Sequence, residues 1–333
     1  MPRHLGVLAP GWVALVVVGL IVVGVGAGSR TLQLLPFLVS VVLFGLPHGA
    51  VDHLVPGRMA TRITLPRGML LVGLGYAVAM VAYGLVWWAL PAIAAVAFIA
   101  MTLLHWGQGD LYTLLRWADC AYYDSRPRRA VAVLLRGSMP MLVPLVGHPA
   151  AYREVLTVFV TVVGGAAATV PPLDAMVVRM TVAVLLPAGG LTVAWWALRW
   201  VQTTHRVQPV LIDLGELLVL SVWFLIVPPI LAVGVYFTMW HALRHLGRLA
   251  EVSPVTQPTL EAGAPARAVA HMLWDAVPLT ALALAGFAAA WFLLPMGPDG
   301  AMSLLGFYLV GIAILTLPHV GVVTWMDRRQ GIW

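Results

Sequence analysis

The sequence predicts an all-α integral membrane protein with about ten transmembrane helices, eight to eleven being possible. Its 333 residues are 61% hydrophobic and only 10% charged, whereas soluble domains carry about 25% charged residues. The mean hydropathy is +0.95. Apolar stretches long enough to cross a bilayer, about 20 residues each, recur along the whole chain. Because no repeat, linker or soluble domain interrupts them, residues 1–333 are expected to form a single membrane domain.

The apolar stretches define the predicted elements in order. The first follows Arg3 and no clear cleavage site comes after it, so we interpret it as a retained span and not as a signal peptide. The run from Leu211 to Leu246 is too long for one crossing, and Pro228-Pro229 is expected to divide it. The expected spans are 11–28, 33–55, 67–89, 92–115, 130–148, 175–198, 210–228, 229–249, 268–294 and 302–325.

The segment 153–170 is apolar but short. An eleventh span, a re-entrant segment and an interfacial helix are all compatible with its composition.

All 19 basic residues are arginines. With a cytoplasmic N-terminus, all but Arg30, Arg136, Arg153 and Arg179 fall on the cytoplasmic side, as the positive-inside rule requires. The absence of lysine excludes Schiff-base chemistry and a retinal-binding rhodopsin. No basic stripe with interleaved aromatic residues is present, which argues against nucleic-acid binding. The single Cys120 excludes a disulfide framework within the chain.

Histidines from four predicted helices fall at a similar depth, near the cytoplasmic side. The arginines alone set this topology, so the agreement in depth is an independent indication of one site. Ionisable residues inside a membrane are functional candidates by default. The five are His48, His105, His241, His245 and His319.

The spacing of these histidines predicts metal ligation. His241 and His245 are four residues apart, so they share a helix face and can bind one ion together. His48 and His105 would complete a set of four neutral imidazoles, a donor set suited to Fe, Zn, Cu or Ni. A single membrane histidine is more often a hydrogen-bonded packing residue than a ligand, and the prediction therefore depends on the group. His53 lies about 140° around the helix from His48 and should point elsewhere.

Other polar and aromatic residues lie at the same level. Metal-bound imidazoles usually donate their second N–H to a carboxylate or carbonyl, so Asp52, Asp110 and Glu216 are candidate partners. For Asp52 and Asp110 the alternative is an ion pair with an arginine at the membrane surface. Several aromatic residues are candidates for lining an apolar substrate channel, with simple core packing as the alternative: Tyr112, Tyr236, Phe237, Trp240 and Tyr308.

Four motifs in order resemble the Brp/Blh family of prokaryotic β-carotene 15,15′-dioxygenases: GLPHGAVDH, HWGQGD, HALRHL and LPHVGVVTWMD, within about residues 40–327. The resemblance implies an Fe(2+) enzyme that uses O2 to split β-carotene into two retinals in the lipid bilayer. It also implies a multi-pass protein of a prokaryotic cell membrane, with possible hand-off of retinal to a rhodopsin. The family's iron ligands fall on His48, His105, His241 and His245. A later Pro-His motif is matched by Pro318-His319, and for His319 we expect a role as a partner of a ligand or as a channel wall.

Other functions remain open at this point. A membrane di-iron desaturase or hydroxylase needs several histidine boxes, but only one H-x-x-x-H occurs here. A b-type haem protein needs only two axial histidines. A metal or proton transporter should have polar residues along a path across the whole membrane, whereas here they gather near one face.

Overall fold

The computed structural model describes residues 4–60, 62–293 and 300–333, and within these ranges the chain is helical with no strand. Nine helices in this part of the chain are long and apolar enough to cross a membrane. The predicted fold class, an all-α multi-pass membrane protein, is confirmed. Arg3 and residue 294, the end of one predicted span, lie outside the described residues.

The helices follow one another with short connections. Eight of the membrane-length helices are single elements, and the second span is broken into pieces. The elements are α1 (Leu5–Val25), α2 (Arg30–Val42), α3 (Gly45–Ala50), η2 (Asp52–Leu54), α4 (Val55–Met59), α5 (Leu65–Ala89), α6 (Pro91–Arg116), α7 (Arg126–Gly147), α8 (Pro149–Thr161), η3 (Ala167–Thr169), α9 (Met176–Thr204), α10 (Gln208–Ile226), α11 (Pro229–Val235), η4 (Tyr236–Ala242), α12 (Leu243–Val252), α13 (Gln257–Glu261), α14 (Pro265–Leu293) and α15 (Ala301–Arg329).

The break in the second span lies next to His48. α2 ends at Val42 and α3 begins at Gly45. A Cβ atom at Gly45 would lie 2.7 Å from the Ser40 carbonyl oxygen and 2.8 Å from a ring carbon of Phe237. Only glycine therefore allows the chain to turn here while packing against η4. The Gly/Pro-rich stretch thus positions α3 against the centre of the molecule.

The predicted break at Pro228-Pro229 is confirmed, because α10 ends at Ile226 and α11 begins at Pro229. The stretch expected as one span, 229–249, consists of α11, the π-helix η4 and α12. π-Helical segments are rare and occur frequently at functional sites. Here the segment carries His241.

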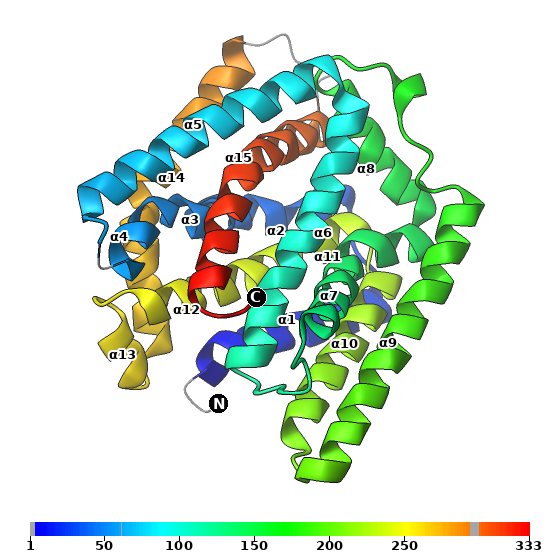
Figure 1. Ribbon diagram of the computed structural model, residues 1–333. Helices are drawn as coiled ribbons and strands as arrows, with labels where there is room; N and C mark the ends of the chain where they lie inside the picture. The colour runs from blue at the N-terminus through cyan, green and yellow to red at the C-terminus, as the bar shows by residue number, and fades with distance from the viewer. Residues whose placement is uncertain (1–3, 61, 294–299) are drawn as a thin grey trace.

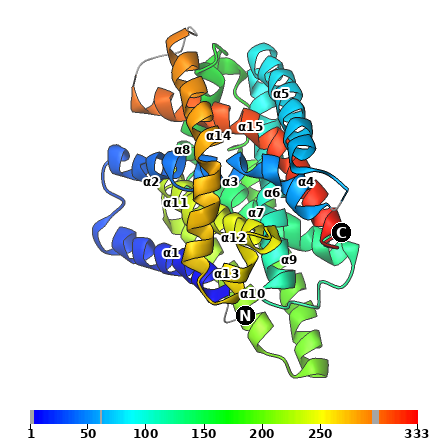
Figure 2. The ribbon, with the colours of Figure 1, turned by 90° about the vertical axis from the view of Figure 1, so that its left-hand side faces the viewer.

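Small residues bring the central helices together. α6 packs closely on α7, and a Cβ atom at Gly107 or Gly137 would clash with the facing backbone at Val133 or Leu103. Figure 1 shows α6, α12 and α15 in the middle of the molecule, with α9 beside α10 at one edge. Figure 2 shows α14 running along the outside, where it packs on α3 and α12.

α8 bears on one of the three interpretations of 153–170, the eleventh span. It has 13 residues, and at 1.5 Å per residue it is about 20 Å long. The hydrocarbon core of a bilayer is about 30 Å thick. α8 by itself is therefore too short to cross.

Candidate metal centre

Five elements each contribute one histidine to the interior of the molecule. We call these residues the histidine centre: His48 on α3, His105 on α6, His241 on η4, His245 on α12 and His319 on α15. None is more than 6% exposed. The histidines grouped by depth in the sequence are therefore brought together by the fold.

His319 lies beside three other rings of the group. Its ring centroid is 4.7 Å from that of His105, 4.9 Å from that of His48 and 5.0 Å from that of His245. His241 lies beside His105 and His48, with its ring centroid 4.8 Å and 5.4 Å from theirs. The rings of His241 and His245 are nearly parallel at 6.5 Å, as expected for residues four apart on one helix face.

The ring nitrogens fit a metal ion. The Nε2 atoms of His105, His241, His245 and His319 are buried, and none has a hydrogen-bond partner in the described part of the chain. Leaving a buried polar atom unpaired costs about 1–3 kcal/mol. Four such atoms in one place therefore indicate a binding site for a metal ion, which accepts their lone pairs. Ligand atoms of His48, His105 and His319 lie within 4.8 Å of one another, and so do those of Asp52, His245 and His319.

Hydrogen bonds fix the tautomers of two rings. The His48 Nδ1–H donates to the Phe44 carbonyl at 3.2 Å, and because a carbonyl only accepts, the proton must be on Nδ1. The same reasoning applies to His319 Nδ1, which lies 2.7 Å from the Asp52 carboxylate. In a neutral ring the lone pair is then on Nε2, the atom available to a metal.

Asp52 accepts two hydrogen bonds, from His319 and from the Tyr76 hydroxyl, which lies 2.5 Å from Oδ2. The sequence analysis proposed Asp52 as the partner of a ligand histidine, and in the structure its histidine partner is His319. Tyr76 was missed altogether. It lies on α5, an apolar helix most of whose residues are not buried, and no motif or spacing marks it.

His53 points away from the histidine centre, as its position on the helix indicated. Its Nδ1 bonds to the Ala50 carbonyl at 2.8 Å, and the side chain is only partly buried.

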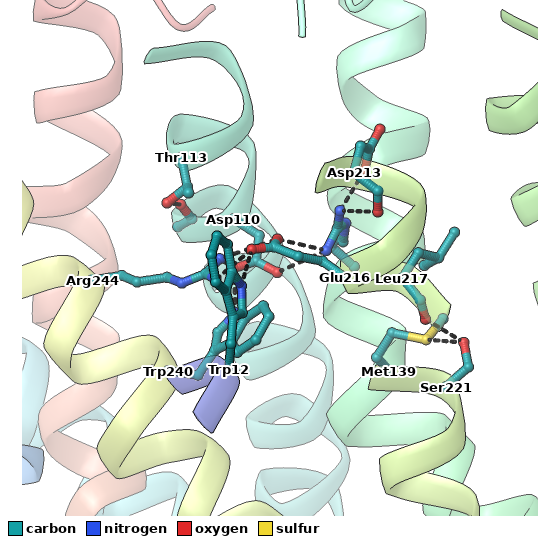
Figure 3. Close-up of polar contacts among 12 residues, drawn as sticks. Trp12, Asp110, Thr113, Met139, Asp213, Glu216, Leu217, Ser221, Trp240 and Arg244 are labelled. Atoms are coloured by element: carbon teal, nitrogen blue, oxygen red, sulfur yellow. Dashed lines mark hydrogen bonds and ion pairs between the residues drawn. The ribbon is translucent and has the colours of Figure 1, made fainter. Parts of the chain in front are cut away.

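Beside the histidine centre lies a second polar cluster, which we call the ion network: Asp110, Arg136, Asp213, Glu216 and Arg244. Arg244 pairs with Glu216 at 2.6 Å and with Asp110 at 3.4 Å. Arg136 pairs with Glu216 at 3.2 Å, with Asp110 at 3.8 Å, and with Asp213. Figure 3 shows Asp110, Glu216 and Arg244 converging from three helices.

Two tryptophans complete the ion network. Trp12 Nε1 donates to Glu216 at 2.8 Å and Trp240 Nε1 donates to Asp110 at 2.9 Å. The Arg244 guanidinium lies 3.6 Å from the centre of the Trp240 ring. Asp110 and Glu216 therefore bond to arginines and tryptophans, and neither carboxylate bonds to a histidine of the centre. Two of their partners, Trp240 and Arg244, are neighbours of His241 and His245 in sequence, so the ion network adjoins the histidine centre.

Among the aromatic channel candidates, Phe237 touches the histidine centre. Its ring centroid lies 5.6 Å from that of His48 and 6.2 Å from that of His241. Trp106, which the sequence did not single out, lies 5.5 Å from His241. Trp240 belongs to the ion network, Tyr112 donates to Glu251, Tyr308 pairs with Ser40, and Tyr236 stacks on Trp240.

Comparison with known proteins gives a consistent result. The family model described as β-carotene 15,15′-dioxygenase matches residues 39–327. A probable β-carotene 15,15′-dioxygenase Blh of Halobacterium salinarum is 43% identical over 325 residues, covering 98% of this chain and 93% of that protein. A probable β-carotene 15,15′-dioxygenase Brp of the same species is 28% identical, covering 93% and 89%. A β-carotene 15,15′-dioxygenase of an uncultured marine bacterium, 66A03, is 37% identical over 76 residues, 22% of this chain and 26% of that protein. No solved structure matches.

Proposed function

This chain belongs to the β-carotene 15,15′-dioxygenase family, and from that premise we propose that it splits the central double bond of β-carotene with O2 at an iron centre. The products are two molecules of retinal, each aldehyde taking one oxygen atom. The proposed iron ligands are His48, His105, His241 and His245. Iron is the choice among the metals that imidazoles bind because the sequence motifs resemble those of iron enzymes.

One observation carries the proposal: buried imidazoles converge in the interior of an apolar membrane protein, and four of their Nε2 atoms have no hydrogen-bond partner among the residues that the structure describes. β-Carotene is a hydrocarbon that dissolves in the bilayer, so a site at membrane depth meets its substrate without extracting it into water. Bound iron would supply the redox chemistry and the open coordination positions with which O2 reacts.

The chain's own residues would bind the metal, orient the ligand rings and provide apolar surface for the substrate. The Phe44 carbonyl holds the proton of His48 on Nδ1 and leaves Nε2 as the donor atom. Phe237 and Trp106 provide apolar surface beside His48 and His241. A polyene has no hydrogen-bonding group, so the choice of the central bond must come from the shape of such surfaces and from the position they give the chain.

Further parts of the proposal concern location. We place the protein in the cell membrane of a prokaryote, with a cytoplasmic N-terminus, a single domain spanning 1–333 and the histidine centre toward the cytoplasmic side. Retinal would then be released into the bilayer, where a rhodopsin can take it up.

The test is expression in a β-carotene-producing bacterial host. Retinal should appear as the orange colour fades, and both effects should disappear in His48→Ala. His53→Ala is the matched control, because this histidine lies five residues away and points elsewhere. Unchanged β-carotene in cells whose purified protein is loaded with iron would contradict the proposal, and metal uptake by those cells would favour the transporter alternative.

A further inference from the structure

We infer that His319 is a ligand of the metal centre, and that Asp52 and Tyr76 hold its ring in the binding orientation. This inference rests on the proposed function for the identity of the metal as iron. It concerns a residue outside the four-histidine set, and three helices distant in sequence contribute to it: η2, α5 and α15.

Position is the first support. His319 is the one residue common to both groups of side chains whose ligand atoms lie within 4.8 Å of one another. Three other histidines of the centre surround its ring at 4.7–5.0 Å between centroids. His241, by comparison, belongs to neither group among the described residues. An ion bound by His48 and His105 would therefore lie within reach of His319.

Protonation is the second support. Asp52 Oδ2 accepts from both His319 Nδ1–H and the Tyr76 hydroxyl. With the proton of a neutral ring held on Nδ1, the lone pair lies on Nε2. That Nε2 atom is buried and has no hydrogen-bond partner within the described residues. A carboxylate that holds the far nitrogen of a ligand imidazole is the recurrent arrangement at protein metal sites.

The role of a channel wall does not account for these contacts. Lining an apolar channel does not require a buried carboxylate, and Asp52 is only 1% exposed. Burying Asp52 without a cation would cost several kcal/mol. A metal ion on His319 Nε2 provides the positive charge that compensates Asp52 through the ring.

The test measures metal binding directly, with Co2+ as a spectroscopic probe, on purified full-length protein in detergent. His319→Gln keeps a side-chain amide that can still donate to Asp52 but removes the imidazole. We expect Co2+ affinity to fall by more than a hundredfold and the Co2+ visible absorption to shift. His53→Ala is the control and should keep the affinity and spectrum of the unmodified protein.

The two supporting residues give graded effects. Asp52→Asn should weaken Co2+ binding by about 10–100-fold, the usual cost of losing the partner of a ligand histidine, and Tyr76→Phe should weaken it less. If His319→Gln does not fold, His319→Gly with added imidazole replaces it, and the small ring should restore the Co2+ absorption band.

The inference is overturned if folded His319→Gln binds Co2+ with unchanged affinity and spectrum, or if imidazole restores nothing to folded His319→Gly. Retinal formation is measured separately. A protein that forms no retinal but needs His319 for Co2+ refutes the proposed function and leaves this inference standing. If the unmodified protein forms retinal but the His319→Gln protein binds Co2+ equally well, the proposed function stands and this inference is refuted.

Discussion

The histidine centre and the ion network are neighbouring polar clusters built on the same helices. α6 carries His105 and Asp110, and Arg244 lies between His241 and His245 in the chain. In the ion network each charged group faces one of opposite sign. In the histidine centre, four Nε2 atoms face no hydrogen-bond partner in the described part of the structure. Of two equally buried clusters, the one whose charged groups form ion pairs with each other supports the fold, and the one with four unpaired ring nitrogens marks a binding site.

The ion network has more acidic than basic groups. Two guanidiniums face three carboxylates, all at most 4% exposed. Burying charges is costly, and removal of one partner leaves the others uncompensated. Substitutions of different members of the ion network should therefore lower the free energy of unfolding by different amounts. Loss of a histidine of the centre should affect function far more than stability.

The largest expected effect is on activity. His245→Ala should reduce retinal formation by more than about a hundredfold, since loss of a ligand exceeds the 10–100-fold typical for loss of a ligand's partner. Iron content should fall in parallel, while the free energy of unfolding changes little relative to the metal-free protein. Product chromatography and metal mass spectrometry on the purified variant are the measurements. Full activity in His245→Ala would contradict the assignment of the histidine centre as the functional site of the two clusters.

The next effect is on stability. Arg136→Met leaves Arg244 alone against three buried carboxylates, so it should lower the free energy of unfolding by about 3–5 kcal/mol. Glu216→Gln leaves two acids facing two arginines and should cost less, about 1–3 kcal/mol for the weakened charged hydrogen bonds. Denaturant unfolding in detergent measures both.

A surface pair supplies the control for that ranking. Asp124 and Arg128 form an exposed ion pair at 3.1 Å, and Asp124→Asn should cost at most about 1 kcal/mol. If Arg136→Met proved no more destabilising than Asp124→Asn, the ion network would have no structural role.

The smallest effect concerns Cys120, in the loop between α6 and α7, outside both clusters. The thiol is fully buried and donates to the Pro209 carbonyl at 3.5 Å. Burial raises the pKa of the Cys120 thiol well above its usual range, so the reactive thiolate stays scarce at neutral and mildly alkaline pH. A maleimide should therefore label the folded protein at pH 8 only after denaturant is added. Rapid labelling of the folded protein would contradict this burial.

Much of the site could be predicted because its signals are local. His241 and His245 are four residues apart in one helix, and Pro228-Pro229 ends a helix through its own ring geometry. His48, His105 and His319 share a depth that arginine counts alone imply. Asp110 and Glu216 had the same local signal, buried carboxylates at the right level, yet they bond to arginines and tryptophans. Nothing local distinguishes a carboxylate that faces a histidine from one that faces an arginine.

The sequence by itself determined the membrane class, the order of the helices and the membership of the histidine centre, since hydropathy, helix breaks and charge bias belong to each segment separately. Only the tertiary structure determined which side chains form hydrogen bonds and ion pairs with one another. His319 and Asp52 are 267 residues apart, and Tyr76 donates to Asp52 from a helix most of whose residues are not buried. Such contacts depend on which helix faces meet. The faces that meet depend in turn on close approaches, such as that of Gly107 in α6 to α7 and that of Gly45 in α3 to η4. The physical reason is that packing is a property of pairs of helices, which no single segment contains.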